Sequence, residues 1–259
     1  MERIVVITGG KGGIGSETVK LFQENHDKVI ILDRTVDPEN EMHYTCDISD
    51  EETVKAVFED IGKRFGRIDI LINNAGYGMN GITELTTSEA ARKIFDVNFF
   101  GLWLCTKYAL PYILEGGKVI NISSAMAIFP VAYRAFYGAS KAAVSALTFA
   151  QRLELEKIGV DMCAICPGDI KTNFTANRVK NFETNERYGN NMKMVTQKMD
   201  RSEDKRIKPI VVAKAIFKIS KKKRTKPMYI VGKKYKFLNF LKHIFPFSWL
   251  LWGCGKVTS

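Results

Sequence analysis

The 259 residues are 46% hydrophobic and 26% charged, a globular composition that excludes a disordered chain and suits one large α/β domain or two small ones. Five dispersed cysteines, few and odd in number, exclude a disulfide-stabilised scaffold and predict a reducing, cytoplasmic location. The net charge of +11 arises in residues 201–259, where 16 Lys or Arg face 2 Asp or Glu, because the first 200 residues have a balance of −3.

Short apolar runs typical of buried strands alternate with helical periodicity along most of the chain. The helices predicted from this pattern include 50–65, 88–112 and 137–158. The predicted strands are 3–7, 28–32, 42–45, 68–73, 117–122, 160–166 and 228–231. This alternation predicts one α/β domain over residues 1–232, a doubly wound parallel sheet of about seven strands flanked by helices.

The first predicted strand runs into a glycine-rich turn at residues 8–16, and a helical pattern with Val19, Leu21 and Phe22 follows. Glycines allow the backbone to approach a pyrophosphate, and a helix N-terminus offers unpaired N–H groups and the positive end of a dipole. Strand, turn and helix together favour a dinucleotide phosphate site over the alternative, a flexible connecting loop.

The second predicted strand is followed by Asp33, 18 residues beyond Gly15. An acidic residue at about this separation hydrogen-bonds the adenosine ribose and disfavours a 2′-phosphate. Arg34 and Lys11 argue in the opposite direction, because cations there bind a 2′-phosphate. Asp33 makes NAD the favoured cofactor and NADP the alternative, while a solvated charge after a strand is the non-functional interpretation.

Tyr137 and Lys141 are four residues apart within a predicted helix and therefore share one face of it. A neighbouring ammonium favours the phenolate form of tyrosine, so Tyr137 could exchange a proton with an alcohol or a carbonyl near neutral pH. Such a pair is common by chance, and its significance depends on the motifs around it.

Cys163 and Cys166 have the CxxC spacing, but they lie within an apolar run that reads as a central strand. Buried structural thiols are therefore favoured over redox or metal chemistry. Three scattered histidines complete no metal-ligand set, and no metal site is expected.

Two segments fall outside the alternating pattern. Residues 173–205 are polar but contain apolar residues such as Met192 and Met194, which is typical of a lid with apolar anchors. Residues 233–259 form a basic and aromatic C-terminal tail, whose apolar part is too short and too interrupted to span a bilayer.

Seven motifs in order make the chain resemble the short-chain dehydrogenase/reductase family. They are Thr-Gly-x-x-x-Gly-Ile-Gly at residues 8–15, Cys46-Asp47-Ile48, Asn73-Asn74-Ala75-Gly76, Val97-Asn98, Ile122-Ser123-Ser124 followed after 13 residues by Tyr137, the Tyr137–Lys141 pair, and Pro-Gly-x-Ile-x-Thr at residues 167–172. The departures are small, Lys11 within the glycine turn and Ala127 in place of a frequent glycine. The resemblance implies a Rossmann-like domain with a nicotinamide cofactor.

The same resemblance implies the roles of individual residues. Tyr137 would be the general acid/base, Ser124 would hydrogen-bond the substrate oxygen, Lys141 would assist Tyr137 and hold the nicotinamide ribose, and Asn98 would position a proton-relay water. The cofactor-binding residues that it implies are Gly9, Lys11, Gly13, Ile14, Gly15, Asp33, Arg34, Asp47, Ile48, Asn74, Ala75, Gly76, Tyr137, Lys141, Pro167, Gly168, Ile170 and Thr172.

The expected reaction is hydride transfer between NAD(P) and a secondary alcohol or ketone. The residues expected around the substrate are mostly apolar: Met126 to Phe129, the loop at residues 77–79, Phe136 and the lid. They favour a hydrophobic substrate such as a hydroxysteroid or bile acid, with another small ketone or acyl substrate as the alternative. A non-catalytic dinucleotide-sensing protein is the third interpretation.

Two parts of the chain are expected to bind partners: the helices that carry Asn98 and Tyr137, and the tail at residues 233–259. The resemblance implies a homodimer or homotetramer formed through the helices that carry Asn98 and Tyr137. The tail is expected to pack on the lid or on a partner subunit. Contact with an anionic membrane surface is the alternative, because lysines beside Phe237, Leu238 and Trp249 suit an interfacial helix. Binding to nucleic acid is not expected.

Overall fold

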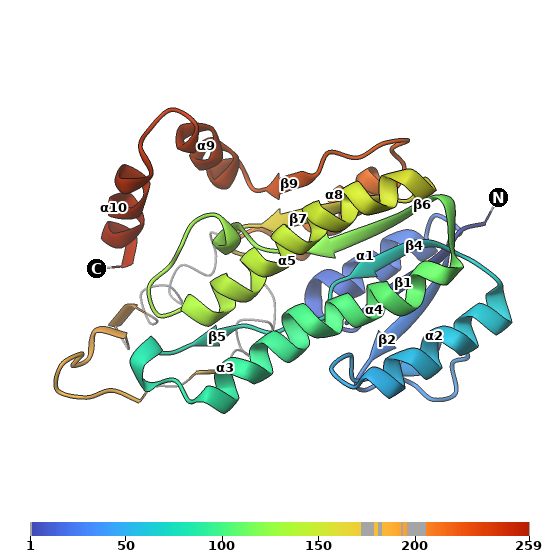
Figure 1. The fold of residues 1–259 in the computed structure, drawn as a ribbon, viewed down its shortest axis with the longest axis horizontal. Coiled ribbons are helices and arrows are strands. Elements are labelled where there is room, and N and C mark those ends of the chain that lie inside the picture. Colours follow the sequence, from blue (N-terminus) through green and yellow to red (C-terminus); the bar gives the residue numbers. More distant parts are fainter. Residues whose placement is uncertain (1, 172–178, 181–182, 193, 196–205, 259) are drawn as a thin grey trace.

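The computed structural model describes residues 2–171, 179–180, 183–192, 194–195 and 206–258 (Figure 1). Its main sheet has seven parallel strands in the order β3-β2-β1-β4-β6-β7-β9, which confirms the predicted Rossmann-like architecture. The strands are β1 Ile4–Thr8, β2 Lys28–Asp33, β3 His43–Thr45, β4 Ile68–Asn73, β6 Ile113–Ile122, β7 Asp161–Pro167 and β9 Met228–Val231. A second, two-stranded sheet pairs β5 Met79–Asn80 with β8 Val179–Lys180.

Helices cover both faces of the main sheet (Figure 1). The α-helices of the fold include α1 Gly13–Gln23, α2 Glu51–Phe65, α3 Ser88–Phe95, α4 Leu102–Ala109, α5 Ala135–Leu155, α8 Pro209–Ser220, α9 Lys233–Lys242 and α10 Phe247–Thr258, of which α9 and α10 lie beyond the sheet. Side chains alternate between the faces of a strand, so Val5 and Ile7 pack with α1 and α8 while Ile4 and Val6 pack on the α2 and α4 side. Among the described helices, none combines the length and the apolar character needed to cross a membrane.

The predicted helix at 88–112 is interrupted in the structure. A single π-helical turn, Asp96–Gly101, separates α3 from α4. Gly101 allows this turn to approach the loop at Ile48, because an added Cβ would lie 2.8 Å from the Ile48 carbonyl oxygen. Turns of this kind are frequent at functional sites, and this one carries Asn98.

A buried polar chain joins the sheet to α4 and α5. Asn73 of β4 pairs in register with Asn121 of β6 and donates to its side-chain oxygen at 2.8 Å. Asn73 also donates to Thr106 of α4 at 2.9 Å, and Asn121 donates to Thr148 of α5 at 2.9 Å. Buried amides and hydroxyls need such partners, so this chain sets the position of both helices on the sheet.

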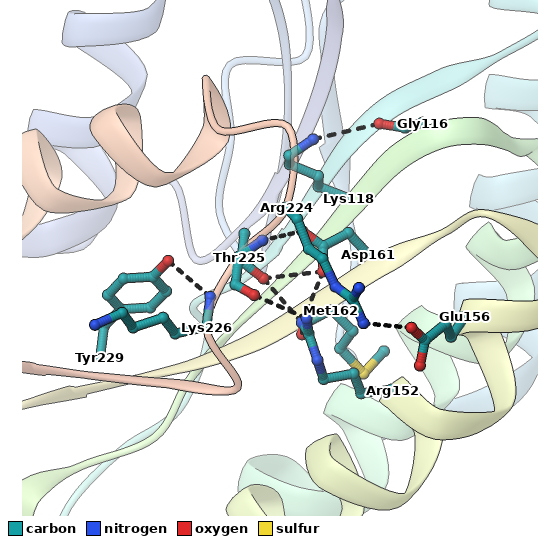
Figure 2. A network of polar contacts seen from close by, with 10 residues as sticks. All are labelled: Gly116, Lys118, Arg152, Glu156, Asp161, Met162, Arg224, Thr225, Lys226 and Tyr229. Carbon is teal, nitrogen blue, oxygen red and sulfur yellow. Dashed lines mark hydrogen bonds and ion pairs between the residues drawn. The ribbon is translucent and has the colours of Figure 1, made fainter.

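A second polar network lies at the C-terminal end of α5 (Figure 2). Arg152 forms an ion pair with Asp161 of β7 at 2.7 Å and donates to the hydroxyl and carbonyl oxygens of Thr225, at 2.9 and 2.8 Å. It also donates to the Met162 carbonyl oxygen, and Asp161 accepts from the Thr225 backbone N–H at 2.6 Å. The network therefore connects α5, β7 and the segment that leads into β9.

The two cysteines of the CxxC spacing lie within β7 and are fully buried. Burial raises the pKa of both thiols, that of Cys163 to about 12. The prediction that both thiols are buried in a strand of the sheet is confirmed.

The predicted lid lies partly outside the described residues. Within the described part, Met192 is buried as predicted, whereas Met194 is exposed. Tyr188 donates to the Glu84 carboxylate at 2.7 Å, which connects this segment to the loop after β5.

Candidate active site

The carboxyl ends of the central strands open into a cleft of about 1150 Å³. Strand order reverses between β1 and β4, since β2 and β3 lie on one side of β1 and β6, β7 and β9 lie beyond β4. Such a switch point leaves a crevice where the connecting loops diverge, and it is where doubly wound sheets bind ligands.

Most of the predicted site residues line this one cleft. They are Gly9, Lys11, Gly13, Ile14, Asp33, Arg34, Asp47, Ile48, Asn74, Ala75, Gly76, Ser124, Tyr137, Lys141, Pro167, Gly168 and Ile170. Gly15 and Asn98 lie directly behind the lining, against Gly9 and Gly76 respectively. Thr172 lies outside the described residues.

The glycine turn has the close packing that a pyrophosphate cradle requires. Gly9 has a φ of +66°, and an added Cβ at Gly15 would lie 2.1 Å from the Gly9 carbonyl oxygen. The Asn74 side chain donates to the carbonyl oxygens of Thr8 and Gly9, at 3.1 and 2.9 Å, and so joins the turn to the end of β4.

The N-terminus of α1 points its backbone toward the cleft. Within the described part of the chain, no side chain caps this helix at Gly12, and its first turn contains no acidic residue. The N–H groups and the positive end of the helix dipole are therefore available to an anion. The residues of the turn fit a dinucleotide pyrophosphate.

Charged residues of both signs gather where the cofactor's adenosine end is expected. The Asp33 carboxylate accepts the backbone N–H groups of Lys11 and Arg34, at 3.1 and 2.8 Å. Burial acts to raise the pKa of Asp47, but hydrogen bonds from Ser49 and the charges of Arg34 and Lys93 outweigh it, so the pKa is lowered. Asp47 is thus ionised at neutral pH.

Ser124, Tyr137 and Lys141 line the same cleft, near the end of β6 and in the first two turns of α5. Ser124 is the second residue after β6, and Tyr137 lies in the first turn of α5 with Lys141 one turn later. The neighbouring Ser123 connects the two elements, because its hydroxyl donates to the Lys141 carbonyl oxygen at 2.8 Å and lies 2.8 Å from the Ser145 hydroxyl. The end of β6 and the start of α5 are held in a common geometry.

The Lys141 amine is buried and donates to the Ile122 carbonyl oxygen at 2.9 Å. Desolvation disfavours the charged amine and lowers its pKa from the usual 10.5 to about 8. A buried amine that still carries a proton near neutral pH can place a positive charge beside Tyr137.

Lys141→Met is expected to increase the free energy of unfolding at neutral pH by about 2 kcal/mol. The native chain buries the Lys141 charge on folding, and the lowered pKa corresponds to a cost of about 3 kcal/mol, at about 1.4 kcal/mol per pKa unit. The variant avoids this cost but loses the hydrogen bond to Ile122, which reduces its gain by about 1 kcal/mol. The burial penalty falls between pH 8 and 10.5, because unfolded lysine still binds a proton in that window whereas the folded amine is neutral.

Urea unfolding at several pH values measures this difference. The gain of the variant over the native chain should shrink steadily between pH 8 and 10.5. Lys20→Met, on an exposed part of α1, is the control and should stay within about 0.5 kcal/mol of the native chain throughout. A gain for Lys141→Met that does not change with pH would contradict the buried charge.

Asn98 is fully buried and joins the π turn to the loop after β4. Its side-chain oxygen accepts the Tyr77 N–H at 2.9 Å, and its amide nitrogen donates to the Tyr77 carbonyl at 3.0 Å and to the Ser140 hydroxyl at 3.2 Å. Gly76 leaves the necessary space, because an added Cβ would lie 2.8 Å from the Asn98 oxygen and 3.4 Å from the Lys141 nitrogen. Asn98 therefore holds the 77 loop beside Lys141.

The substrate side of the cleft is only partly as predicted. Met126 and residues 77–79 line it, but Phe129 and Phe136 are absent from its described lining. Arg134 and Arg206 line it instead, and neither was predicted. Arg134 is buried and donates to Asn80 at 3.1 Å. It immediately precedes α5, a position that gives no sequence signal for a cleft residue.

Sequence reasoning also missed Tyr235 of α9. Its hydroxyl donates to the Asp169 carboxylate at 2.7 Å, and its ring lies so close to Gly168 that an added Cβ there would be 2.1 Å from it. Burial and the Asp169 charge raise the pKa of Tyr235. Helix α9 thus supports the loop after β7 from outside the cleft, across 66 residues of sequence.

No group of three or more His, Cys, Asp or Glu side chains that could hold a metal ion occurs in the parts of the chain that the structure describes. The side chains that line the cleft include the Tyr137 phenol, the Lys141 amine and the Ser124 hydroxyl, together with the glycine turn. They suit proton exchange beside a bound dinucleotide.

Comparison with known proteins agrees with a dinucleotide-binding site that exchanges protons. The family model described as short chain dehydrogenase matches residues 3–183. A 3-ketodihydrosphingosine reductase of Bacteroides thetaiotaomicron is 35% identical over 182 residues, covering 68% of this chain and 67% of that protein. A probable short-chain type dehydrogenase/reductase VdlC of Helicobacter pylori is 32% identical over 255 residues, covering 95% and 94%.

Solved structures are similar over most of the chain. A short-chain dehydrogenase from Streptomyces avermitilis superposes with a TM-score of 0.82 at 25% identity, covering 94% of both chains. ElxO with NADP bound has a TM-score of 0.75 at 27% identity, covering 92% of this chain and 100% of that one. A Brucella melitensis 3-ketoacyl-(acyl-carrier-protein) reductase complexed with NADH has a TM-score of 0.73 at 26% identity, covering 88% and 96%.

Proposed function

Because the chain belongs to the short-chain dehydrogenase family of NAD(P)-dependent oxidoreductases, we propose that it transfers a hydride between NAD(P) and an apolar secondary alcohol or ketone. The observation that carries the proposal is that Ser124, Tyr137 and Lys141 line one cleft together with the glycine turn. This arrangement combines a site for a dinucleotide with groups that exchange a proton.

Four residues of the protein would have separate roles in the reaction. When bound, the nicotinamide ring supplies the hydride donor or acceptor. Tyr137 gives a proton to the substrate oxygen during reduction and takes it back during oxidation. Ser124 donates a hydrogen bond to the same oxygen, and the charge of Lys141 favours the phenolate. Asn98 positions the loop beside them.

The cofactor would be held along the rest of the cleft. Gly9, Gly13, Ile14 and Gly15 would hold the pyrophosphate at the N-terminus of α1. The adenosine end would lie by Asp33, Arg34, Asp47 and Ile48, and the middle by Asn74, Ala75 and Gly76. Pro167, Gly168, Ile170 and Thr172 would contact the nicotinamide.

Among substrates, we propose a hydrophobic ketone or alcohol, such as a hydroxysteroid or a bile acid. Apolar walls at Met79, Met126 and Ile170 support it. The similarity to a 3-ketodihydrosphingosine reductase favours a long-chain ketone as the alternative. Arg134 beside these walls would suit the carboxylate of a bile acid.

An absorbance assay of NADH and NADPH oxidation tests the function. The panel contains steroid, bile-acid, long-chain 3-keto, acyl and sugar ketones, each with both cofactors. Turnover of a hydrophobic member above the sugar and small acyl substrates supports the proposal. Cofactor binding without turnover of any member would instead support a dinucleotide-sensing protein.

Asp33→Ser is expected to shift the ratio of kcat/KM for NADH over NADPH by about 100-fold toward NADPH. Removing a carboxylate next to a 2′-phosphate relieves a repulsion of several kcal/mol, and Lys11 and Arg34 remain to bind the phosphate. Steady-state kinetics with both cofactors measures the ratio. Asp37→Ser, an exposed change on the same loop, is the control and should leave the ratio unchanged. A native chain that already prefers NADPH would overturn the assignment of NAD.

A further inference from the structure

The C-terminal part of the chain lacks acidic residues altogether. Residues 206–259 contain 14 Lys or Arg and no Asp or Glu. Helix α9 begins two residues after β9 and therefore starts at the carboxyl edge of the sheet, the edge that carries the cleft. Figure 1 shows α9 and α10 reaching beyond the layers of the main fold. We call the exposed side chains of residues 233–256 the tail surface.

Large apolar side chains are concentrated on the tail surface. Half of the sixteen exposed large hydrophobic residues in the described chain lie between 237 and 252. They are Phe237, Phe240, Ile244, Phe245, Phe247, Trp249, Leu251 and Trp252, each at least 43% exposed. Single exposed apolar residues are normal on any protein, but a contiguous group indicates a binding surface.

Positive charges surround this apolar group. Lys233, Lys234, Lys236, Lys242 and Lys256 are all exposed. Lys256 lies 4.4 Å above the Trp252 ring, and Phe245 stacks on Trp249 with ring centroids 5.5 Å apart. Exposed cationic and aromatic side chains therefore alternate along residues 233–256.

A second basic group, residues 221–224, is close to residues 233–236 in the sequence but lies at the opposite edge of the sheet. Residues 221–224 precede β9 and lie at the amino edge of the sheet, whereas residues 233–236 follow β9 at the carboxyl edge. Lys221 covers the Phe217 ring at 4.1 Å, and Arg224 pairs with Glu156. Of these two groups, only 233–236 adjoins the exposed aromatic residues of the tail surface. The group at 221–224 therefore provides a matched control for the contribution of lysines to binding.

We propose that the tail surface docks on an anionic lipid bilayer. Aromatic and aliphatic side chains enter the boundary between headgroups and acyl chains, and the lysines pair with anionic headgroups. Pairing of this surface with itself in a second copy would bring two acid-free surfaces together, and like charges would oppose it. A nucleic acid would satisfy the lysines but would leave Ile244, Phe247 and Leu251 in water. The proposal goes beyond hydride transfer and does not depend on it.

Vesicle co-sedimentation of the full chain tests the proposal, with phosphatidylcholine vesicles that contain or lack phosphatidylglycerol. We expect binding to the anionic vesicles, weaker binding to the neutral ones, and loss of binding at high salt. Two of the three tryptophans, Trp249 and Trp252, lie on the tail surface. In a Trp103→Phe background, their fluorescence should therefore shift to shorter wavelength on binding.

Matched variants locate the binding surface. The triple change of Lys233, Lys234 and Lys236 to Gln should weaken binding by about 100-fold, at about fivefold per lysine. The same change at Lys221, Lys222 and Lys223 should alter it less than about twofold. Phe247→Ser with Trp252→Ser should also weaken binding, and the comparably exposed pair Leu114→Ser with Ile158→Ser should not.

Thermal unfolding of each variant separates loss of binding from loss of folding. Equal losses from both lysine triples would overturn the proposal, because the attraction would then be unspecific. Unchanged binding in the tail variants would also overturn it. So would self-association or duplex DNA binding that depends on the tail when vesicle binding does not occur.

Discussion

Tyr137→Phe is expected to lower kcat by about 10³-fold and to leave the dissociation constant of the dinucleotide within about twofold. Positioned general acid/base groups contribute between about 10² and 10⁴ in rate, and the Tyr137 phenol is the proposed proton donor to the substrate oxygen. The phenylalanine ring keeps the packing of the first turn of α5, so the cofactor site should persist. Steady-state kinetics and fluorescence titration with NADH measure the two quantities.

Tyr133→Phe is the matched control. Tyr133 lies four residues earlier, and its side chain does not line the cleft described by the structure. It should retain turnover within about twofold of the native chain, because the change removes a hydroxyl that lies outside the cleft lining and keeps the ring. Near-normal turnover of Tyr137→Phe would refute its role. An equal loss in both variants would indicate damage to the start of α5 rather than loss of a proton donor.

Arg152→Met is expected to lower the free energy of unfolding by about 3 kcal/mol. The guanidinium joins α5 to Asp161, Met162 and Thr225 (Figure 2), and both members of its ion pair are 13% exposed. Removing one partner of a buried pair leaves the other charge without compensation, which typically destabilises by about 3–5 kcal/mol. Thr225 still donates to Asp161, so the lower end of that range is expected. For a chain of this size the melting temperature should fall by roughly 6–12 °C.

The same figure contains the control, Arg224→Met. Arg224 pairs with Glu156 where both side chains are largely exposed, at 72% and 55%. Exposed pairs contribute little, so the expected change is within about 0.5 kcal/mol. Urea unfolding measures both variants. A similar small loss for each would contradict the buried network as the connection that holds the end of α5.

The apolar strand runs were sufficient to predict the sheet. In the central strands both faces are covered by helices, so they read as largely apolar runs such as 3–7 and 68–73. The glycine turn could also be predicted from the sequence. Its close packing requires glycine, because a Cβ at residue 15 would overlap the Gly9 carbonyl oxygen. Tyr137 and Lys141 were found because helical geometry places residues four apart on one face.

Other features left no mark on the sequence. The helical pattern at 88–112 continues across the π turn, because an extra residue in the turn hardly alters the apolar periodicity. Asn98 was identified from its motif, but its bonds to Tyr77 and Ser140 depend on how three elements pack. Arg134 lines the cleft, and Tyr235 contacts the loop after β7 that borders it. No local sequence pattern predicts either contact.

The sequence by itself determined the family, the sheet, the glycine turn and the four residues expected to carry the chemistry. The sheet and the glycine turn follow from short-range periodicity and spacing, whereas the family and the four residues come from the resemblance of motifs along the chain. Only the tertiary structure decided which of two basic groups adjoins the exposed aromatics, that α9 supports the loop at Gly168, and that a buried arginine lines the substrate side. Those relations join residues far apart in the chain, and the packing of strands and helices alone brings them together.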